Sequence, residues 1–281
     1  MALQFSFGTV GAPITTPKKP GGSVGAVEHI HRLGLGSLEL GWVQSVRVNE
    51  STCLAIKETA EKNQVNISVH APYFINLNAD DEEWPKSRKR LMDAAFYGNL
   101  AGATDIIFHP GSLFARTAEE VLPVVLKRLA DCAKELKEMG NQVILRPETM
   151  GKVAMLGSLT DTLIMSREIE GILPCLDFAH LHARAGDGSI NSKAEFLEIL
   201  SSYKAYLGSE SLKHLHIHLS GIEYGPKGEK NHLPLKESDL NLVELFDALH
   251  QLNCCGRILC ESPAMEKDAI YMRDLWESAA K

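Results

Sequence analysis

Val65-Asn66-Ile67-Ser68-Val69-His70-Ala71-Pro72 is the stretch of the chain that best indicates its fold. Apolar β-branched residues alternate with small polar ones up to His70, which predicts a buried strand. Pro72 cannot continue a central strand, so the chain is expected to turn just after the histidine. His70 is therefore predicted at the carboxyl end of a strand, which is where barrel enzymes place their chemistry.

The same pattern recurs along the chain. Strand-like runs are predicted at 3–7, 37–40, 65–70, 105–112, 142–148, 173–177, 213–219 and 257–261, and helices between them at 24–33, 50–63, 84–102, 117–139, 158–169, 193–206 and 238–252. Strands that alternate with helices predict parallel pairing. Eight such units predict an α/β fold, a single (β/α)8 TIM barrel over residues 1–281, with its site at the carboxyl ends of the strands. A doubly wound open sheet is the alternative, and it would gather its ligands at one crevice.

Composition excludes several classes of protein. The 281 residues are 44% hydrophobic and 23% charged, which is ordinary globular usage. The formal net charge of −7 excludes a uniformly basic surface, so contact with DNA requires a local basic patch or bound cations. The six cysteines form no CxxC pair, which favours reduced, buried thiols. No apolar run approaches the ~20 residues of a membrane span and no signal peptide is evident, so we expect a cytoplasmic monomer without membrane contact.

Residues able to bind metals occur at the predicted carboxyl ends of six successive strands. These candidates are His70, His109, Glu148, Asp177, His180, His216 and Glu261. The strand ends of a barrel converge on one mouth, so the side chains could share metal ions, and burying so many ionisable groups without a metal would be costly. Imidazoles with carboxylates suit Zn²⁺, Mn²⁺ or Fe²⁺ better than Mg²⁺ or Ca²⁺. His214 and His218 share a face with His216 at period two, so some of these three are expected to be neighbours rather than ligands.

Six motifs in order resemble the endonuclease IV family of apurinic/apyrimidinic endonucleases, metal-dependent barrels of the xylose isomerase-like group. They are residues 70–77 (HAPYFINL), 108–112 (FHPGS), 148–152 (ETMGK), 176–180 (LDFAH), 216–220 (HIHLS) and 258–263 (ILCESP). The resemblance implies hydrolysis of DNA 5′ to abasic sites by a metal-bound hydroxide at a zinc-rich site.

The resemblance also implies a role for individual residues. One metal is assigned to His70, His109 and Glu148; a second to Glu148, Asp177, His216 and Glu261; and a third to His180 with His232 from the motif after the seventh strand. Glu148 and Glu261 are the catalytic candidates, and Tyr73, Asn76 and Lys230 are the substrate-binding candidates. Zinc is the expected metal, with Mn²⁺ or Fe²⁺ as alternatives.

The sequence departs from the family pattern at three places. The family has an Asp-x-His pair after the seventh strand, but the Asp position falls here on Lys230, which cannot be a ligand while protonated. Glu229 could substitute after a shift of one residue. The family's His-Leu-Asn-Asp segment lacks its Asp in residues 216–219, and the loop at 41–47 has Trp42 and Arg47 but no clear counterpart of the family's Arg-rich loop. Two metal positions are therefore expected, and the third depends on Glu229.

Two other functions remain open. The quartet Glu148, Asp177, His216 and Glu261 also resembles the single-metal site of ketose epimerases, where two glutamates act as acid and base on a small sugar. The additional imidazoles of His70, His109, His180 and His232 favour the multinuclear phosphodiesterase. A metal-dependent binding module without turnover is the third possibility.

The basic cluster Lys86, Arg88, Lys89 and Arg90 is expected to be a solvated helix face rather than a patch that follows phosphates.

Overall fold

Eight parallel strands form the centre of the computed structural model, which describes residues 5–279. They are β1 (Phe5–Val10), β2 (Ser37–Gly41), β3 (Asn66–His70), β4 (Ala103–Phe108), β5 (Ile144–Pro147), β6 (Cys175–Asp177), β7 (Leu215–Leu219) and β10 (Gly256–Cys260). Their order in the sheet is β5-β4-β3-β2-β1-β10-β7-β6. Parallel bridges from Leu145 to Ile172 and from Glu148 to Cys175 join the two outer strands, so the ring closes. The predicted TIM barrel is confirmed.

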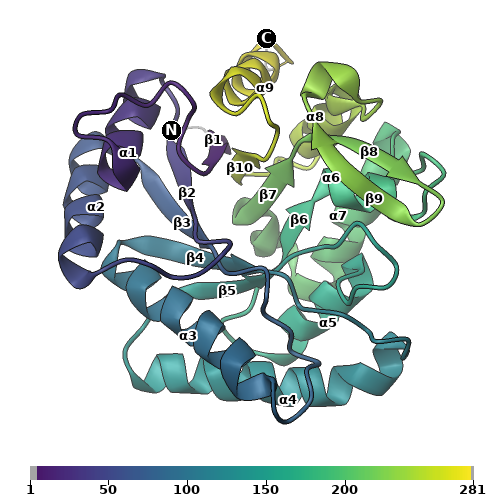
Figure 1. Cartoon of the computed structure of the whole chain (residues 1–281). Helices are drawn as coiled ribbons and strands as arrows, with labels where there is room; N and C mark the ends of the chain where they lie inside the picture. The colour runs from purple at the N-terminus through teal and green to yellow at the C-terminus, as the bar shows by residue number, and fades with distance from the viewer. Residues whose placement is uncertain (1–4, 280–281) are drawn as a thin grey trace.

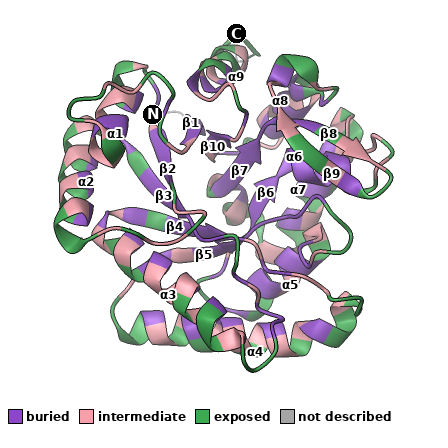
Figure 2. Ribbon diagram, viewed as in Figure 1, coloured by how far each residue is buried: buried purple, intermediate pink, exposed green. Residues whose placement is uncertain are grey.

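Helices surround this ring on its outside, as Figure 1 shows. They are α1 (Gly22–Arg32), α2 (Glu50–Asn63), α3 (Trp84–Leu100), α4 (Ala118–Glu138), α5 (Leu159–Glu168), α6 (Phe178–Arg184), α7 (Lys193–Leu207), α8 (Leu242–Gln251) and α9 (Glu266–Ala279), with short 3₁₀ turns η1 (Ser209–Lys213) and η2 (Leu235–Glu237). None of the helices within residues 5–279 is long and apolar enough to cross a membrane. Figure 2 shows buried strands and helices whose outer faces are exposed.

Local signals explain why the helices begin where they do. Thr117 and Glu120 form a reciprocal capping box at the start of α4, as do Ser192 and Glu195 at α7. Asn49 accepts the backbone N–H of Thr52 at 2.9 Å and so caps α2. These side chains satisfy amide groups that a helix leaves without partners in its first turn.

The barrel interior is polar from bottom to top. At the amino-terminal end, Asp105 binds the guanidinium of Arg146 and, at 3.2 Å, that of Arg257. The middle of the barrel holds Glu39, and the carboxyl-terminal end holds the candidate metal ligands. Barrel interiors are more often filled by branched apolar side chains, so this polar column needs charge compensation along its length.

Several elements differ from the sequence-based prediction. The chain after β7 forms an antiparallel hairpin of β8 (Gly221–Gly225) and β9 (Gly228–Leu233), and α6 and α9 were not predicted. The first predicted strand begins at residue 3, outside the described residues, and the fourth ends at Phe108 rather than at 112. All six cysteines are buried and free, as expected.

Candidate metal centre

Glu148 lies at the centre of the site, directly after β5, and is fully buried. Its Oε2 is 3.2 Å from Nε2 of His70 and 3.4 Å from Nε2 of His109. Its Oε1 is 3.2 Å from Nδ1 of His180 and 3.6 Å from Nδ1 of His218. The two carboxylate oxygens therefore face different imidazoles, which is the arrangement that a bridging carboxylate requires.

A second group shares Glu148. It consists of Glu148, Asp177, His218 and Glu261, whose ligand atoms all lie within 4.8 Å of one another. Asp177 is the N-cap of α6, since its Oδ1 accepts the backbone N–H of His180 at 2.7 Å. Because Oδ1 is used in this way, Oδ2 is left to face the site. The helix cap thus fixes both Asp177 and His180, three residues further on.

The structure places His218 in this group, where His216 was expected. In the register of the sheet, Asp177 pairs with His218, whereas His216 pairs with Cys175. His216 is therefore one level deeper in the barrel, and its Nε2 lies 2.9 Å from Glu39 instead. The expected grouping of His216 with Asp177 is wrong because period two defines the face of a strand but not the level of a residue along it.

A third group forms at the hairpin. Nε2 of His180 lies 3.3 Å from Nε2 of His232 and 3.6 Å from Oε2 of Glu229. The pairing of β8 and β9 passes from Glu223–Asn231 directly to Tyr224–Glu229, so Lys230 is the extra residue of a β-bulge. Nζ of Lys230 pairs with Glu223 at 3.1 Å. The bulge thus provides the one-residue shift that brings Glu229 to the site in place of Lys230.

Three histidines share a hydrogen-bonding pattern that suits metal ligands. Nδ1 of His70 lies 2.9 Å from the carbonyl oxygen of Ala71, Nδ1 of His180 lies 3.0 Å from that of Thr149, and Nδ1 of His232 lies 3.2 Å from that of Glu261. A carbonyl only accepts, so each Nδ1 carries a proton, and in the neutral form of each ring the lone pair of Nε2 points into the site. Outer hydrogen bonds of this kind orient metal-bound imidazoles.

The electrostatics of the site also favour bound cations. Among residues 5–279, Oε1 of Glu148, Oδ2 of Asp177 and Nδ1 of His218 are buried without a well-formed hydrogen bond. Burial raises the pKa of Asp177, and the nearby carboxylates of Glu148 and Glu261 raise it further against the opposing effect of His180. Burial lowers the pKa of His70, yet contact with Glu148 outweighs this and leaves it above its ordinary value. The residues present therefore fit divalent cations.

The substrate-binding candidates have different surroundings. Tyr73 is 46% exposed and stacks on His109, with ring centroids 4.9 Å apart, so it lies at the mouth of the site. The side-chain oxygen of Asn76 accepts the backbone N–H of Asn78 at 2.9 Å, which gives Asn76 a role in shaping its own loop. Lys230 is exposed on the bulge and paired with Glu223.

The basic cluster on α3 is neutralised by acidic neighbours. Each of its four cations contacts a carboxylate; the partners are Glu83 for Lys86 and Arg90, Glu135 for Arg88 and Asp93 for Lys89. The solvated helix face expected from the sequence fits these pairs better than a patch that follows a phosphate backbone.

Three residues of the site were missed or undervalued in the sequence. His218 was treated only as a neighbour of His216, and Glu229 only as a possible substitute. Glu39 was read simply as part of a strand, although a carboxylate inside the short run Ser37-Leu38-Glu39-Leu40 is itself a signal, since buried strands seldom carry a charge without a partner.

Comparisons with known proteins identify the family of the chain. The family model for xylose isomerase-like TIM barrels matches residues 27–279. An uncharacterised protein of Methanocaldococcus jannaschii is 38% identical over 271 residues, which cover 96% of each chain. A probable endonuclease 4 of Aquifex aeolicus is 28% identical over 190 residues, which cover 66% of each chain.

Solved structures show the same fold. Endonuclease IV from Thermus thermophilus has a TM-score of 0.72 at 21% identity, covering 97% of this chain and 98% of its own. A D-tagatose 3-epimerase-like protein also has a TM-score of 0.72, at 17% identity, covering 98% and 97%. These equal scores do not separate an endonuclease from an epimerase. The chain belongs to the xylose isomerase-like TIM barrel family, and among its sequence relatives are probable endonucleases 4.

Proposed function

We propose that the protein is a metal-dependent phosphodiesterase that hydrolyses DNA 5′ to abasic sites. The observation that carries this proposal is the position of Glu148 between two sets of ligands: Oε2 faces His70 and His109, and Oε1 faces His218. A carboxylate shared in this way suits two cations about 3.5–4 Å apart, the spacing of two-metal phosphoesterases. The probable endonucleases 4 among its relatives support the same reaction class.

The reaction is the addition of water across the P–O3′ bond, which leaves a 3′-hydroxyl and a 5′-phosphate. Zinc or another divalent transition metal, when bound, would neutralise the phosphate and make water more acidic. Glu261, between His218 and His232 at 3.5 and 3.8 Å, is placed to hold the proton of the attacking water. Tyr73 offers an exposed aromatic ring at the mouth, on which a nucleotide can stack.

We propose that a third cation position is formed by His180, His232 and Glu229. Two nitrogen ligands at about 2.0–2.1 Å from a tetrahedral zinc ion lie about 3.3 Å apart, by simple geometry. The two Nε2 atoms of His180 and His232 have this separation, 3.3 Å, which suits one cation bound by both rings. Glu229 supplies the negative charge.

Replacement of Glu229 by glutamine tests the third cation position. Glu229→Gln should lower the metal content by one ion per chain, measured by elemental analysis after dialysis. The matched control is Lys230→Ala, which removes the neighbouring charge on the exposed side of the bulge and should keep the full complement. Equal metal content in the wild type and Glu229→Gln would contradict this assignment.

The second candidate function is the epimerisation of a small sugar. It is favoured by the group Glu148, Asp177, His218 and Glu261, which could hold one ion between two glutamates. His70 and His109 have no part in such a one-metal site, and they separate the two functions.

Incision of a duplex oligonucleotide with one abasic-site analogue tests the proposed function. The metal-loaded wild type should cut 5′ to the lesion and leave an undamaged duplex intact. His109→Ala should reduce incision by at least about 100-fold, because loss of a ligand costs more than loss of its outer hydrogen-bond partner. An enzyme that leaves the DNA intact but converts ketoses, with or without His109, would establish the epimerase.

A further inference from the structure

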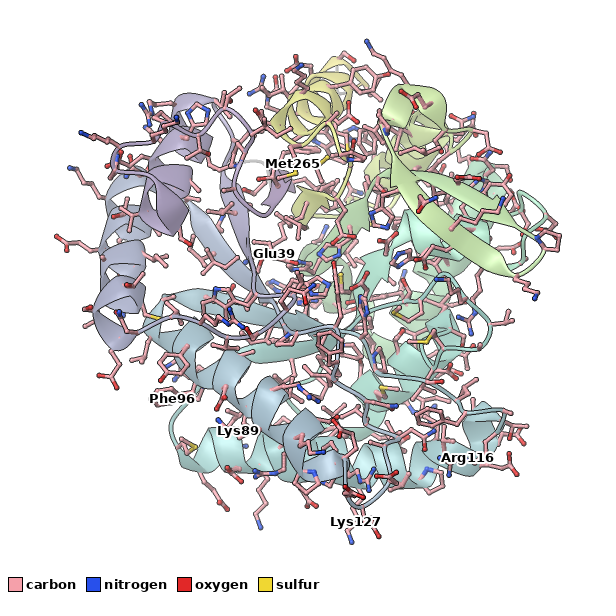
Figure 3. All side chains as sticks on the ribbon, viewed as in Figure 1. Glu39, Lys89, Phe96, Arg116, Lys127 and Met265 are labelled. Atoms are coloured by element: carbon pink, nitrogen blue, oxygen red, sulfur yellow. The ribbon has the colours of Figure 1, made fainter. Side chains whose placement is uncertain are left out.

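Glu39 is a fully buried carboxylate that the proposed reaction does not use. It lies on β2 and points into the barrel, where Figure 3 labels it near the centre of the ring of strands, far from Lys89 and Lys127 on the outer helices. A buried carboxylate without partners would be strongly unfavourable, so its surroundings have to compensate its charge.

Three side chains surround Glu39. Its Oε2 accepts the hydroxyl of Ser68 at 2.7 Å and lies 2.9 Å from Nε2 of His216. Its Oε1 lies 3.0 Å from Nε2 of His218, although this contact is bent away from a straight hydrogen bond. Burial would raise the pKa of Glu39, but the imidazoles of His218 and His216 hold it well below its ordinary value.

The contact with His218 links Glu39 to the metal centre. The ring of His218 has one nitrogen on each side: Nε2 faces Glu39, and Nδ1 faces Oε1 of Glu261 at 3.5 Å. Because a carboxylate only accepts, Glu39 favours the tautomer with the proton on Nε2. In that tautomer the lone pair of Nδ1 is free to bind a cation.

We propose that Glu39 is a positioning residue that fixes the tautomer and orientation of His218 as a metal ligand. The inference rests on the metal centre of the proposed function. Ser68 and His216 hold Oε2, so Oε1 is kept beside His218. This gives His216 a role as an anchor for Glu39, and it explains why two histidines two residues apart on β7 both face the same carboxylate.

Zinc affinity is the first test, measured on the full chain by competition with a chromogenic chelator. Glu39→Gln keeps the shape of the side chain, but it loses the charge and can accept a hydrogen bond only at its oxygen. It should bind zinc about 10- to 100-fold more weakly, as is typical when an outer partner of a ligating histidine is lost. The matched control is Glu170→Gln, the same exchange at an exposed carboxylate that pairs with Lys137 on the outside of the barrel, and its zinc affinity should be unchanged.

The outcomes separate this inference from the proposed function. Wild-type affinity in Glu39→Gln, together with loss of an ion in His218→Ala, would overturn the role of Glu39 alone. A wild-type chain that binds no divalent metal would overturn both.

A second measurement needs no variant and therefore does not depend on whether Glu39→Gln folds. Long-range ¹H–¹⁵N correlation spectra of the wild type report which nitrogen of each histidine carries the proton. In the zinc-loaded protein, His218 should carry its proton on Nε2, the nitrogen that faces Glu39, and should bind zinc through Nδ1. A proton on Nδ1 of His218 in the zinc-loaded protein would contradict the proposal, because the ring would then bind zinc through the nitrogen that faces Glu39.

Discussion

At the scale of the residue, the account depends on which histidine of β7 (Leu215–Leu219) reaches the metal centre. His218 pairs with Asp177 in the register of the sheet, at the carboxyl end of the strands. His216 pairs with Cys175, deeper in the barrel. We predict that His218→Ala lowers the metal content by at least one ion per chain, because it removes a nitrogen from the shared group. His216→Ala should retain the full content in elemental analysis. The reverse result would show that His216 is the ligand.

The sequence predicts that these histidines share one face of a strand, but it does not predict how far along the barrel axis each one lies. Alternation along residues 214–218 shows that three histidines share a face, and nothing local distinguishes them. The level is set by pairing with β6 and β10, which are distant in the sequence. His70, His109 and Glu148 were easier to place. His70 is the last residue of its strand and His109 and Glu148 directly follow theirs, and Pro72 and Pro110 mark two of these strand ends.

At the scale of the element, the hairpin β8–β9 completes the site from outside the barrel. Glu229 approaches α6 across Gly151, whose carbonyl accepts the backbone N–H of Glu229 at 2.9 Å. A Cβ added at Gly151 would lie 2.7 Å from Cβ of Glu229 and 2.6 Å from its Oε2. The glycine is therefore required for the hairpin to reach His180.

We predict that Gly151→Ala displaces Glu229 and lowers the metal content by one ion per chain, while the ions at Glu148 remain. The control is Gly41→Ala, where an added Cβ would meet only ordinary contacts at 3.8 Å or more. Elemental analysis with a crystal structure of each variant would check this. A full metal content in Gly151→Ala with an unmoved hairpin would contradict it.

The hairpin was also not predicted from the sequence. The eight barrel strands and seven of the helices follow from apolar periodicity, turn residues and caps such as Thr117 and Ser192. Residues 221–233 contain a bulge at Lys230, which breaks the alternation that a regular strand would show. Helix α6 has only seven residues, too few for a helical period to be recognised.

At the scale of the whole molecule, stability depends on a buried ion network at the end of the barrel opposite the site. Asp105 binds both Arg146 and Arg257 there. Asp105→Asn would leave the buried Arg146 and the partly buried Arg257 without this counterion, and we predict a loss of about 3–5 kcal/mol in the free energy of unfolding by urea. Glu170→Gln, which breaks an exposed pair with Lys137, should have no measurable effect. Equal stability of both variants would contradict this role.

The same network predicts a dependence of stability on pH. Burial would raise the pKa of Asp105, but Arg146 and Arg257 hold it well below its ordinary value. The contribution of ionised Asp105 to the free energy of unfolding is therefore fully present above the pKa of this carboxyl in the unfolded chain, about 3.9. It is lost progressively as the pH falls below that value. Urea titrations between pH 3 and pH 7 (from about one unit below to about three units above the pKa of the unfolded carboxyl) should show the advantage of the wild type over Asp105→Asn shrinking at the acidic end. A difference in stability between the wild type and Asp105→Asn that stays constant with pH would contradict this prediction.

The central claim is that Glu148 is shared between cations, and the metal content of the full chain tests it most directly. Elemental analysis of protein purified without chelators should give two or three zinc or similar transition-metal ions per chain. Glu148→Gln should lose ions from both sides at once, since Oε2 faces His70 and Oε1 faces His218. A single ion per chain that persists when His70 and His109 are replaced by alanine would contradict the account and favour a one-metal sugar enzyme.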